Sequence, residues 1–277
     1  MIQRKEGGFG MTQSRVTILG ARGSVPVSAP AFARYGGATT CVLVRLAGTD
    51  IVLDAGTGIL RLPPDILDRP GLALLLTHAH LDHLNGFSMC PFMMQSGRTL
   101  DIYAAAQSGL SIETILDNLY SPPVWPVRPS QLAAELRYHE VAPEFAVGGV
   151  TVRSMDGVHP GGVKLFRLTA DGKSVVFATD CTLTETLYPA VVEFARGCDL
   201  LLCDGQYSDA EFAARSGFGH NTWKTAAKLG ADCGAARTRI IHHDPTHTDA
   251  ILDAAAEEVR AVNGACGFAS EGEVIDL

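Results

Sequence analysis

Four side chains that can bind a metal ion fall within six positions of this 277-residue sequence: His78, His80, Asp82 and His83. They follow the apolar run Leu72 to Leu76, which is typical of a buried strand. Side chains two apart on an extended strand point the same way, so His78 and His80 can share one cation. Asp82 and His83 come where the chain turns, and they can bind a second cation. Imidazole and carboxylate ligands with no thiolate favour Zn²⁺, with Mn²⁺ or Fe as substitutes.

Two cations about 3.5–4 Å apart can share a bridging hydroxide and stabilise both ends of an in-line displacement. Such a pair needs more ligands than the first motif supplies. Further candidates follow strand-like runs later in the chain: His159, Asp180, His242 and His243. Each alone is as readily an ordinary polar residue, and the set gains its meaning from the first motif. His242 and His243 would face opposite ways on a strand, so only one of them can serve.

The composition predicts a substantial core, because 47% of the residues are hydrophobic and 19% are charged. We expect residues 15–277 to form one hydrolase domain, and the polar, glycine-rich residues 1–14 to form a flexible tail. The seven cysteines are scattered without a CxxC pair, which favours reduced thiols in a cytoplasmic protein. No apolar run approaches the roughly 20 residues of a membrane span, so no membrane partner is expected.

Short apolar or β-branched runs are mixed with helical patterns along the chain. We expect strands near 16–19, 40–46, 50–56, 72–78 and 100–105, and again in LRYHEV, VTVRSM, KLFRLTA, SVVFATD, LLLCDG and RIIHHD. We expect helices over 109–119, 184–196, 221–230 and 248–263. Strands and helices mixed in this way, with several hairpins, favour two mainly antiparallel sheets covered by helices, an α/β sandwich.

Two motifs resemble the metallo-β-lactamase superfamily. HAHLDH, residues 78–83, matches the HxHxDH signature of that family, and LDAGTG, residues 53–58, is similar to the strand-end aspartate motif that precedes it. The order of the later candidate ligands also agrees. The resemblance covers residues 15–277, and it implies an αββα sandwich of two mixed sheets flanked by helices, with the metals at one edge of the sheets.

The resemblance also implies a division of ligands between two divalent metal ions. His78, His80 and His159 would hold one ion, Asp82, His83 and a terminal histidine would hold the other, and Asp180 would bridge them. The apolar strand before the terminal histidine favours His242, with His243 as the alternative. Asp54 would orient a ligand histidine by a hydrogen bond, a role that metal sites commonly need.

Other segments resemble the phosphodiesterase-type branch of the superfamily, which includes ribonuclease Z-like enzymes and class II cyclic nucleotide phosphodiesterases. These are GARGSVP at 20–26, YGGATTCVLV at 35–44 and GFGHNTW at 217–223. The last resembles a segment in which a histidine lies beside the scissile phosphate, so His220 would be a general acid or a phosphate-binding group. The alternative is that His220 and Asn221 only cap a helix.

The formal net charge of −8 makes the chain a poor general binder of nucleic acid. The sequence also has no long inserted arm of the kind that clamps tRNA in ribonuclease Z. We therefore expect a small phosphodiester or ester substrate and no large nucleic acid. Arg22, Arg34 and Lys224 are candidate phosphate donors, although each is more readily a plain surface charge. Trp125 and Trp223 could stack a base, and burial in the core is the competing expectation for them.

The resulting hypothesis is a dinuclear metal-dependent hydrolase, a phosphodiesterase acting on a small nucleotide, with a cyclic nucleotide as one candidate. Asp82 and His220 are its expected catalytic residues. The same ligands would serve a lactone or thioester hydrolase, and a metal-bound sensor without activity is a third reading. The intact Asp82, usually lost in inactive relatives, makes the sensor the weakest of the three. A homodimer is a further expectation, because many relatives dimerise.

Overall fold

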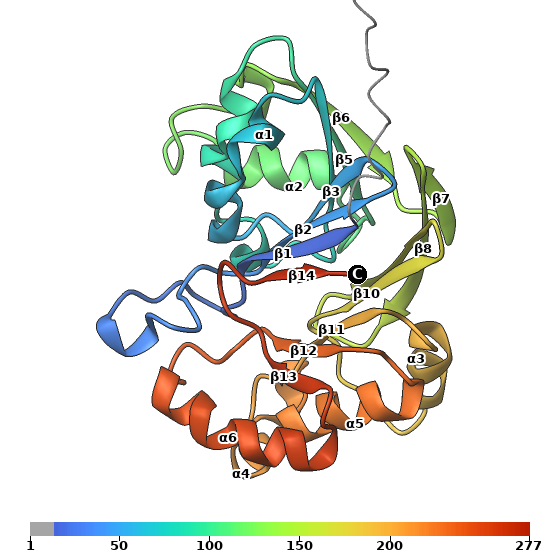
Figure 1. Cartoon of the computed structure of the whole chain (residues 1–277). Coiled ribbons are helices and arrows are strands. Elements are labelled where there is room, and N and C mark those ends of the chain that lie inside the picture. The colour runs from blue at the N-terminus through green and yellow to red at the C-terminus, as the bar shows by residue number, and fades with distance from the viewer. Residues whose placement is uncertain (1–13) are drawn as a thin grey trace, which may run out of the picture.

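Two seven-stranded β-sheets face each other in the computed structural model, which describes residues 14–277 (Figure 1). The first sheet has the order β14 (Val274–Asp276), β1 (Arg15–Gly20), β2 (Cys41–Leu46), β3 (Thr49–Leu53), β4 (Gly71–Leu75), β5 (Thr99–Ala104), β6 (Glu135–Glu140). The second has the order β13 (Cys266–Phe268), β12 (Thr238–Ile241), β11 (Leu200–Asp204), β10 (Lys173–Ala178), β9 (Val163–Ala170), β8 (Val150–Gly157), β7 (Glu144–Val147). The predicted tail, residues 1–14, lies outside the described residues apart from Ser14.

Helices cover the outer face of each sheet (Figure 1). The first sheet carries α1 (Pro64–Leu67), α2 (Ile112–Leu119) and several single 3₁₀ turns. The second sheet carries α3 (Tyr188–Ala195), α4 (Asp209–Arg215), α5 (Trp223–Cys233) and α6 (Asp249–Val262). The αββα sandwich is therefore confirmed. No helix of the described part is both long and apolar enough to cross a bilayer.

Three apolar layers hold the sandwich together, one between the sheets and one under each set of helices. Strand β2 shows how a single run serves two of them. Val42, Val44 and Leu46 belong to the layer between the sheets, whereas Cys41 and Leu43 belong to the layer under the first helices. Successive side chains of a strand point to opposite faces. A strand buried on both faces is mainly apolar, which explains the run CVLV, and the partly buried Arg45 is the one charged residue in this strand.

The pairing is half antiparallel and half parallel in each sheet, so the expectation of mainly antiparallel sheets is wrong. Strands β14 to β3 and β7 to β10 pair antiparallel, and β3 to β6 and β10 to β13 pair parallel. The helical patterns between the parallel strands are their crossovers. Because parallel strands end at the same edge of a sheet, polar residues that follow β3, β4, β10, β11 and β12 are brought together there.

Candidate metal centre

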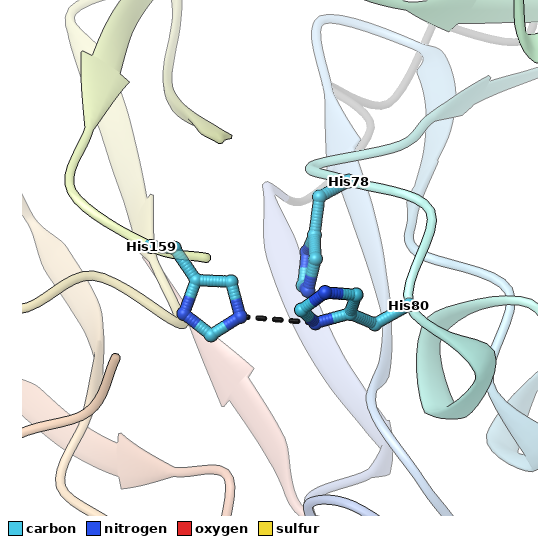
Figure 2. A group of neighbouring side chains, drawn as sticks. All are labelled: His78, His80 and His159. Atoms are coloured by element: carbon cyan, nitrogen blue, oxygen red, sulfur yellow. Dashed lines mark hydrogen bonds between the residues drawn. The ribbon is translucent and has the colours of Figure 1, made fainter. Parts of the chain in front are cut away.

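The first group of candidate ligands consists of His78, His80 and His159, shown in Figure 2. Strand β4 ends at Leu75 rather than continuing through His78, and both histidines lie on the loop that follows. His159 approaches from the loop after β8, and its Nε2 lies 3.0 Å from His80 Nδ1. Each of the three rings offers one nitrogen within 4.8 Å of the others. His80 is the exposed member, so the group is open to solvent on its side.

The second group consists of Asp82, His83 and His242, all buried, with one ligand atom of each within 4.8 Å of the others. Asp82 Oδ2 lies 3.0 Å from His242 Nε2 and 3.4 Å from His83 Nε2. His242 directly follows β12, and the neighbouring His243 turns away from the group. The Nε2 of His243 donates to the backbone oxygen of Ala269, and burial lowers the pKa of His243 to about 3. Of the two alternatives, only His242 lies in the centre.

Asp180 lies between the two groups. Its Oδ1 is 3.1 Å from His242 Nε2 and 4.0 Å from His78 Nε2, and its Oδ2 is 3.4 Å from His83 Nε2. Burial raises the pKa of Asp180, but the surrounding imidazoles hold it well below its usual range. A carboxylate that faces both groups with different oxygens is suited to bridging two cations.

The backbone is strained at three of the strand ends that meet here. Asp54, Asp180 and His242 have φ values of 59°, 53° and 62°. Few residues other than glycine adopt this left-handed region, and each such residue costs about 1–3 kcal/mol that the surrounding fold must supply. The strain turns each side chain from its strand toward the centre. Strain of this kind concentrates at functional sites.

The other ring nitrogen of four candidate histidines is held by a partner. His83 Nδ1 lies 2.8 Å from Asp54 Oδ2, and His242 Nδ1 lies 3.1 Å from Gln206 Oε1. The remaining pairs are His78 Nδ1 with Thr77 Oγ1 at 3.0 Å, and His159 Nδ1 with the Gly219 oxygen at 3.1 Å. Such partners select the tautomer and aim the free nitrogen, as is usual for metal-binding histidines. Asp54 is thus the hydrogen-bond partner of one candidate ligand, His83.

Two observations show that the residues present fit divalent cations. The Nε2 atoms of His78 and His83 are buried and have no hydrogen-bond partner among the described residues. Buried polar atoms normally have one, so these two nitrogens are suited to coordinating a cation. Burial lowers the pKa of His83, but Asp82, Asp180 and Asp54 raise it well above its usual value. Carboxylates concentrated on one imidazole in this way provide negative charge that a cation can balance.

His220 lies at the same centre and is paired with Asp204 at the end of β11. His220 Nδ1 is 3.0 Å from Asp204 Oδ2 and 3.8 Å from Asp180 Oδ1. Its ring stacks on that of His242 with centroids 4.7 Å apart. Burial lowers the pKa of His220, but the Asp204 carboxylate raises it to about 9 overall. One ring nitrogen of His220 also lies within 4.8 Å of ligand atoms of Asp180 and His159. His220 therefore lies beside both the candidate bridging carboxylate and the first group of histidines.

The alternative of a helix cap does not apply to His220. Helix α5 begins at Trp223, and its N-cap is Thr222, whose side chain accepts from the Thr225 backbone nitrogen. Asn221 instead joins two loops, because its side chain accepts from the Leu183 nitrogen and donates to the Cys181 oxygen. In the segment GHNT, residues 219–222, His220 therefore faces the centre. Asn221 and Thr222 hold the backbone that follows it.

Comparison with known proteins places this centre in a family. The model of the Beta-lactamase superfamily domain matches residues 49–243, well over half of the chain. The chain belongs to the metallo-β-lactamase superfamily. Its fold is that of the metallo-β-lactamase fold protein YhfI from Bacillus subtilis, with a TM-score of 0.72, 19% identity and coverage of 95% of this chain and 99% of that one. Divalent metal ions are thereby implied for the centre.

Relatives in this superfamily include ribonucleases. Ribonuclease Z from Brevibacillus brevis is 33% identical over 92 residues, which are 32% of this chain and only 27% of that enzyme. The structure of human tRNase Z, short form, has a TM-score of 0.66 and 19% identity, and it covers 95% of this chain and 98% of that one. The expectation of no large nucleic acid is contradicted by these relatives. A net charge sums the whole surface and omits bound metals, so it does not describe one phosphate-binding site.

The three basic candidates for phosphate binding are either paired with carboxylates or buried. Arg34 pairs with Asp253, and Lys224 pairs with Asp209 at 3.1 Å and Glu258 at 3.2 Å. Arg22 is fully buried. The tryptophans are also occupied: Trp223 is 6% exposed in the core, and Trp125 packs against Tyr120. None of these five side chains contacts the candidate ligands in the family's motif.

Arg22 instead forms hydrogen bonds that hold two loops together in the interior of the fold. Its guanidinium donates to the backbone oxygens of Gly36, Asp244 and His247 over 2.7–3.2 Å. It thereby ties the loop after β1 to the loop after His242. Burial lowers the pKa of Arg22, and nearby carboxylates counteract part of the effect. A side chain that satisfies three buried carbonyl groups contributes to stability rather than to phosphate binding.

Replacing Arg22 by methionine is expected to lower the free energy of unfolding by about 2–5 kcal/mol, because several buried carbonyl groups lose their donor. Urea unfolding followed by circular dichroism measures the change. Arg137, which pairs on the surface with Glu135, is the matched control, and its replacement should leave the midpoint almost unchanged. An Arg22→Met midpoint equal to that of the unaltered protein would contradict this assignment.

Gln107 connects the two loops that carry the first group of histidines. Its Oε1 accepts from the Ala79 backbone nitrogen, between His78 and His80. Its Nε2 donates to the oxygens of Gly161 and Gly162 at 3.1 and 2.8 Å, just beyond His159. Gly161 and Gly162 have φ values of 86° and 88°, which suit glycine. One amide thus sets the distance between the two sides of this group.

Replacing Gln107 by alanine is expected to weaken metal binding at the first group about 10–100-fold, as for other residues that orient ligands. The second group should keep its affinity, because Gln107 does not touch it. Titration of the metal-free protein against a chromophoric chelator separates a tight from a weakened site. Gln95 is a partly buried control whose amide donates to the Pro91 oxygen and not to a loop that carries a candidate ligand. Equal affinity in the Gln107 variant and the unaltered protein would show that this amide does not position the ligands.

Proposed function

We propose that this chain is a hydrolase of phosphodiesters that depends on two divalent cations. One observation carries the proposal: two groups of ligand-type side chains meet around Asp180, with His220 at their border. The assignment of ligands follows the geometry of the two groups. We infer one cation at His78, His80 and His159, a second at Asp82, His83 and His242, and Asp180 between them. Asp54 orients His83.

The chemistry that bound divalent cations supply is Lewis acidity, which activates water near neutral pH and polarises phosphoryl oxygens. The protein's own residues must then place the substrate and move a proton. His220 is the group at the border of the centre that can carry a proton to the departing oxygen. Asp204 holds Nδ1 of that ring at 3.0 Å, which directs Nε2 away from Asp204. Ser24, whose backbone nitrogen donates to Asp82 Oδ2 at 2.8 Å, keeps that carboxylate in place.

The substrate that we propose is a phosphodiester of a nucleotide. The stretch shared with ribonuclease Z supports this class of bond, because that relative is named for cleaving RNA. A small cyclic nucleotide contains the same bond and stays a candidate beside RNA. Zinc as the native metal, a cytoplasmic location and a homodimer also stay predictions.

A substrate panel tests the proposal. The purified, metal-loaded protein is offered bis(p-nitrophenyl) phosphate, cyclic nucleotides, an RNA with a 3′ extension, a lactone and a thioester. Turnover of phosphodiesters that is lost on chelation and restored by metal supports the proposal. Turnover of the lactone or thioester alone would replace it by ester hydrolysis on the same residues. Tight metal binding without turnover of any substrate would favour a sensor.

A further inference from the structure

One aromatic side chain stands out at the rim of the centre. Thirteen large hydrophobic side chains are exposed in residues 14–277, and Phe218 is the only aromatic one among them. It is 60% exposed, and it lies two residues before His220. Large aromatic side chains are usually buried, because burial removes much apolar surface from water. An exposed phenylalanine beside a candidate catalytic histidine therefore points to a partner that covers it.

The turn that carries Phe218 contacts the loop that carries His159. Gly219 has a φ of 95°, and its oxygen lies 3.1 Å from His159 Nδ1. A Cβ atom at Gly219 would lie 2.1 Å from His159 Nδ1 and 2.6 Å from Pro160 Cδ, so the two segments are in direct contact. Val158, the residue before His159, is 48% exposed. Phe218 and Val158 are thus exposed apolar residues on two segments that contact each other at the rim of the centre.

Two basic side chains near these segments in the sequence, Arg215 and Lys164, are engaged with other residues. Arg215 lies over the Tyr207 ring and 3.5 Å from Asp244. Lys164 pairs with Asp156 at 2.6 Å. The rim therefore offers an apolar face rather than a basic one. A substrate whose phosphate lies at the metal centre can therefore gain apolar contacts from this rim.

We propose that Phe218 and Val158, here called the rim pair, bind the nucleobase of the nucleotide whose phosphate is cleaved. The base stacks on the Phe218 ring, and Val158 packs against its edge. This inference rests on the proposed function, and it adds to it the part of the substrate that is recognised. Every base has a π face, so such a stack tolerates changes of base, and it should favour nucleotides over simple alkyl phosphodiesters.

The test compares a ligand that has a base with one that lacks it. Isothermal titration of the metal-loaded protein with thymidine 5′-monophosphate and with methyl phosphate separates the base from the phosphate. Phe218→Ala should weaken binding of the nucleotide about tenfold, the size of one base–aromatic stack, and leave methyl phosphate unchanged. Phe218→Trp should restore nucleotide binding. Val124→Ala removes another exposed side chain far along the sequence and should change neither affinity.

Turnover gives a second readout that separates this inference from the proposed function. With thymidine 5′-p-nitrophenyl phosphate, Phe218→Ala should raise KM and leave kcat unaltered, whereas methyl p-nitrophenyl phosphate should show no change. Equal loss of affinity for the nucleotide and for methyl phosphate, or no loss for either, would overturn the rim pair. Absence of turnover in the unaltered protein would remove the proposed function, and the titration would still decide the rim pair.

Discussion

Asp180→Ala is expected to lower phosphodiester turnover by about 10³-fold or more, since metal ions supply several kcal/mol of transition-state stabilisation and each 1.36 kcal/mol is tenfold. The reason is the position of Asp180 between the two groups of ligands, with Oδ1 3.1 Å from His242 and Oδ2 3.4 Å from His83. Removing it deletes a carboxylate that faces both groups. Metal content by mass spectrometry should fall below that of the unaltered protein, and steady-state kinetics measures the loss.

The matched control for this variant is Asp156→Ala. Asp156 lies in β8, its side chain is 83% exposed, and it pairs with Lys164. Its loss should change neither metal content nor turnover. Circular dichroism of both variants checks that the fold is intact. Full metal content together with full turnover in Asp180→Ala would contradict the bridging assignment.

His220→Ala is expected to lower kcat by about 10²–10⁴-fold, the contribution of a positioned general acid, while both metals stay bound. The loss should depend on the leaving group. An alkoxide, as in a nucleotide ester, needs a proton when it departs, whereas p-nitrophenolate leaves without one. We therefore expect a large loss with a cyclic nucleotide or RNA and a small loss with bis(p-nitrophenyl) phosphate. Asp204→Asn should show the same pattern with a smaller loss, about 10–100-fold, because Asp204 only orients the ring.

The chain offers a close control for the His220–Asp204 pair. His139 Nε2 lies 2.8 Å from Asp101 Oδ1 on strands β6 and β5, which is the same kind of pair on a different part of the first sheet. His139→Ala should leave kcat unchanged. Loss of metal in His220→Ala would instead make His220 a ligand, and an equal loss with both leaving groups would remove its role as an acid.

Local pattern indicated which residues of the centre follow strands. The apolar run before HAHLDH predicts a strand end, and the observed β4 ends three residues before His78. Asp54, Asp180 and His242 follow β3, β10 and β12, so their placement needs only the sheet and its parallel order. The strand pattern alone did not predict the parallel halves of the sheets, because the crossover helices carry no signal that distinguishes them from helices after hairpins. Only the family resemblance implied mixed sheets, which the structure confirms.

Residues whose role depends on a distant neighbour could not be predicted in this way. Asp204 ends the run LLLCD just as Asp180 ends another, and that signal was available, but its partner His220 lies 16 residues away. Gln107 and Gln206 act through single side-chain amides that no spacing marks. Arg22 is the opposite case, because the sequence suggested phosphate binding for a residue that has a structural role. A charge in a glycine-rich segment resembles a phosphate donor, yet its length and five donors let it satisfy three buried carbonyls from two loops.

Stoichiometric reconstitution tests the central claim, a two-cation centre that hydrolyses phosphodiesters, most directly. The protein is stripped with a chelator and titrated with Zn²⁺ or Mn²⁺, and bound metal and hydrolysis of bis(p-nitrophenyl) phosphate are measured on the same sample. We predict that activity rises to its maximum as the second equivalent per chain binds. Full activity without metal, or saturation of both binding and activity at one equivalent, would contradict the account.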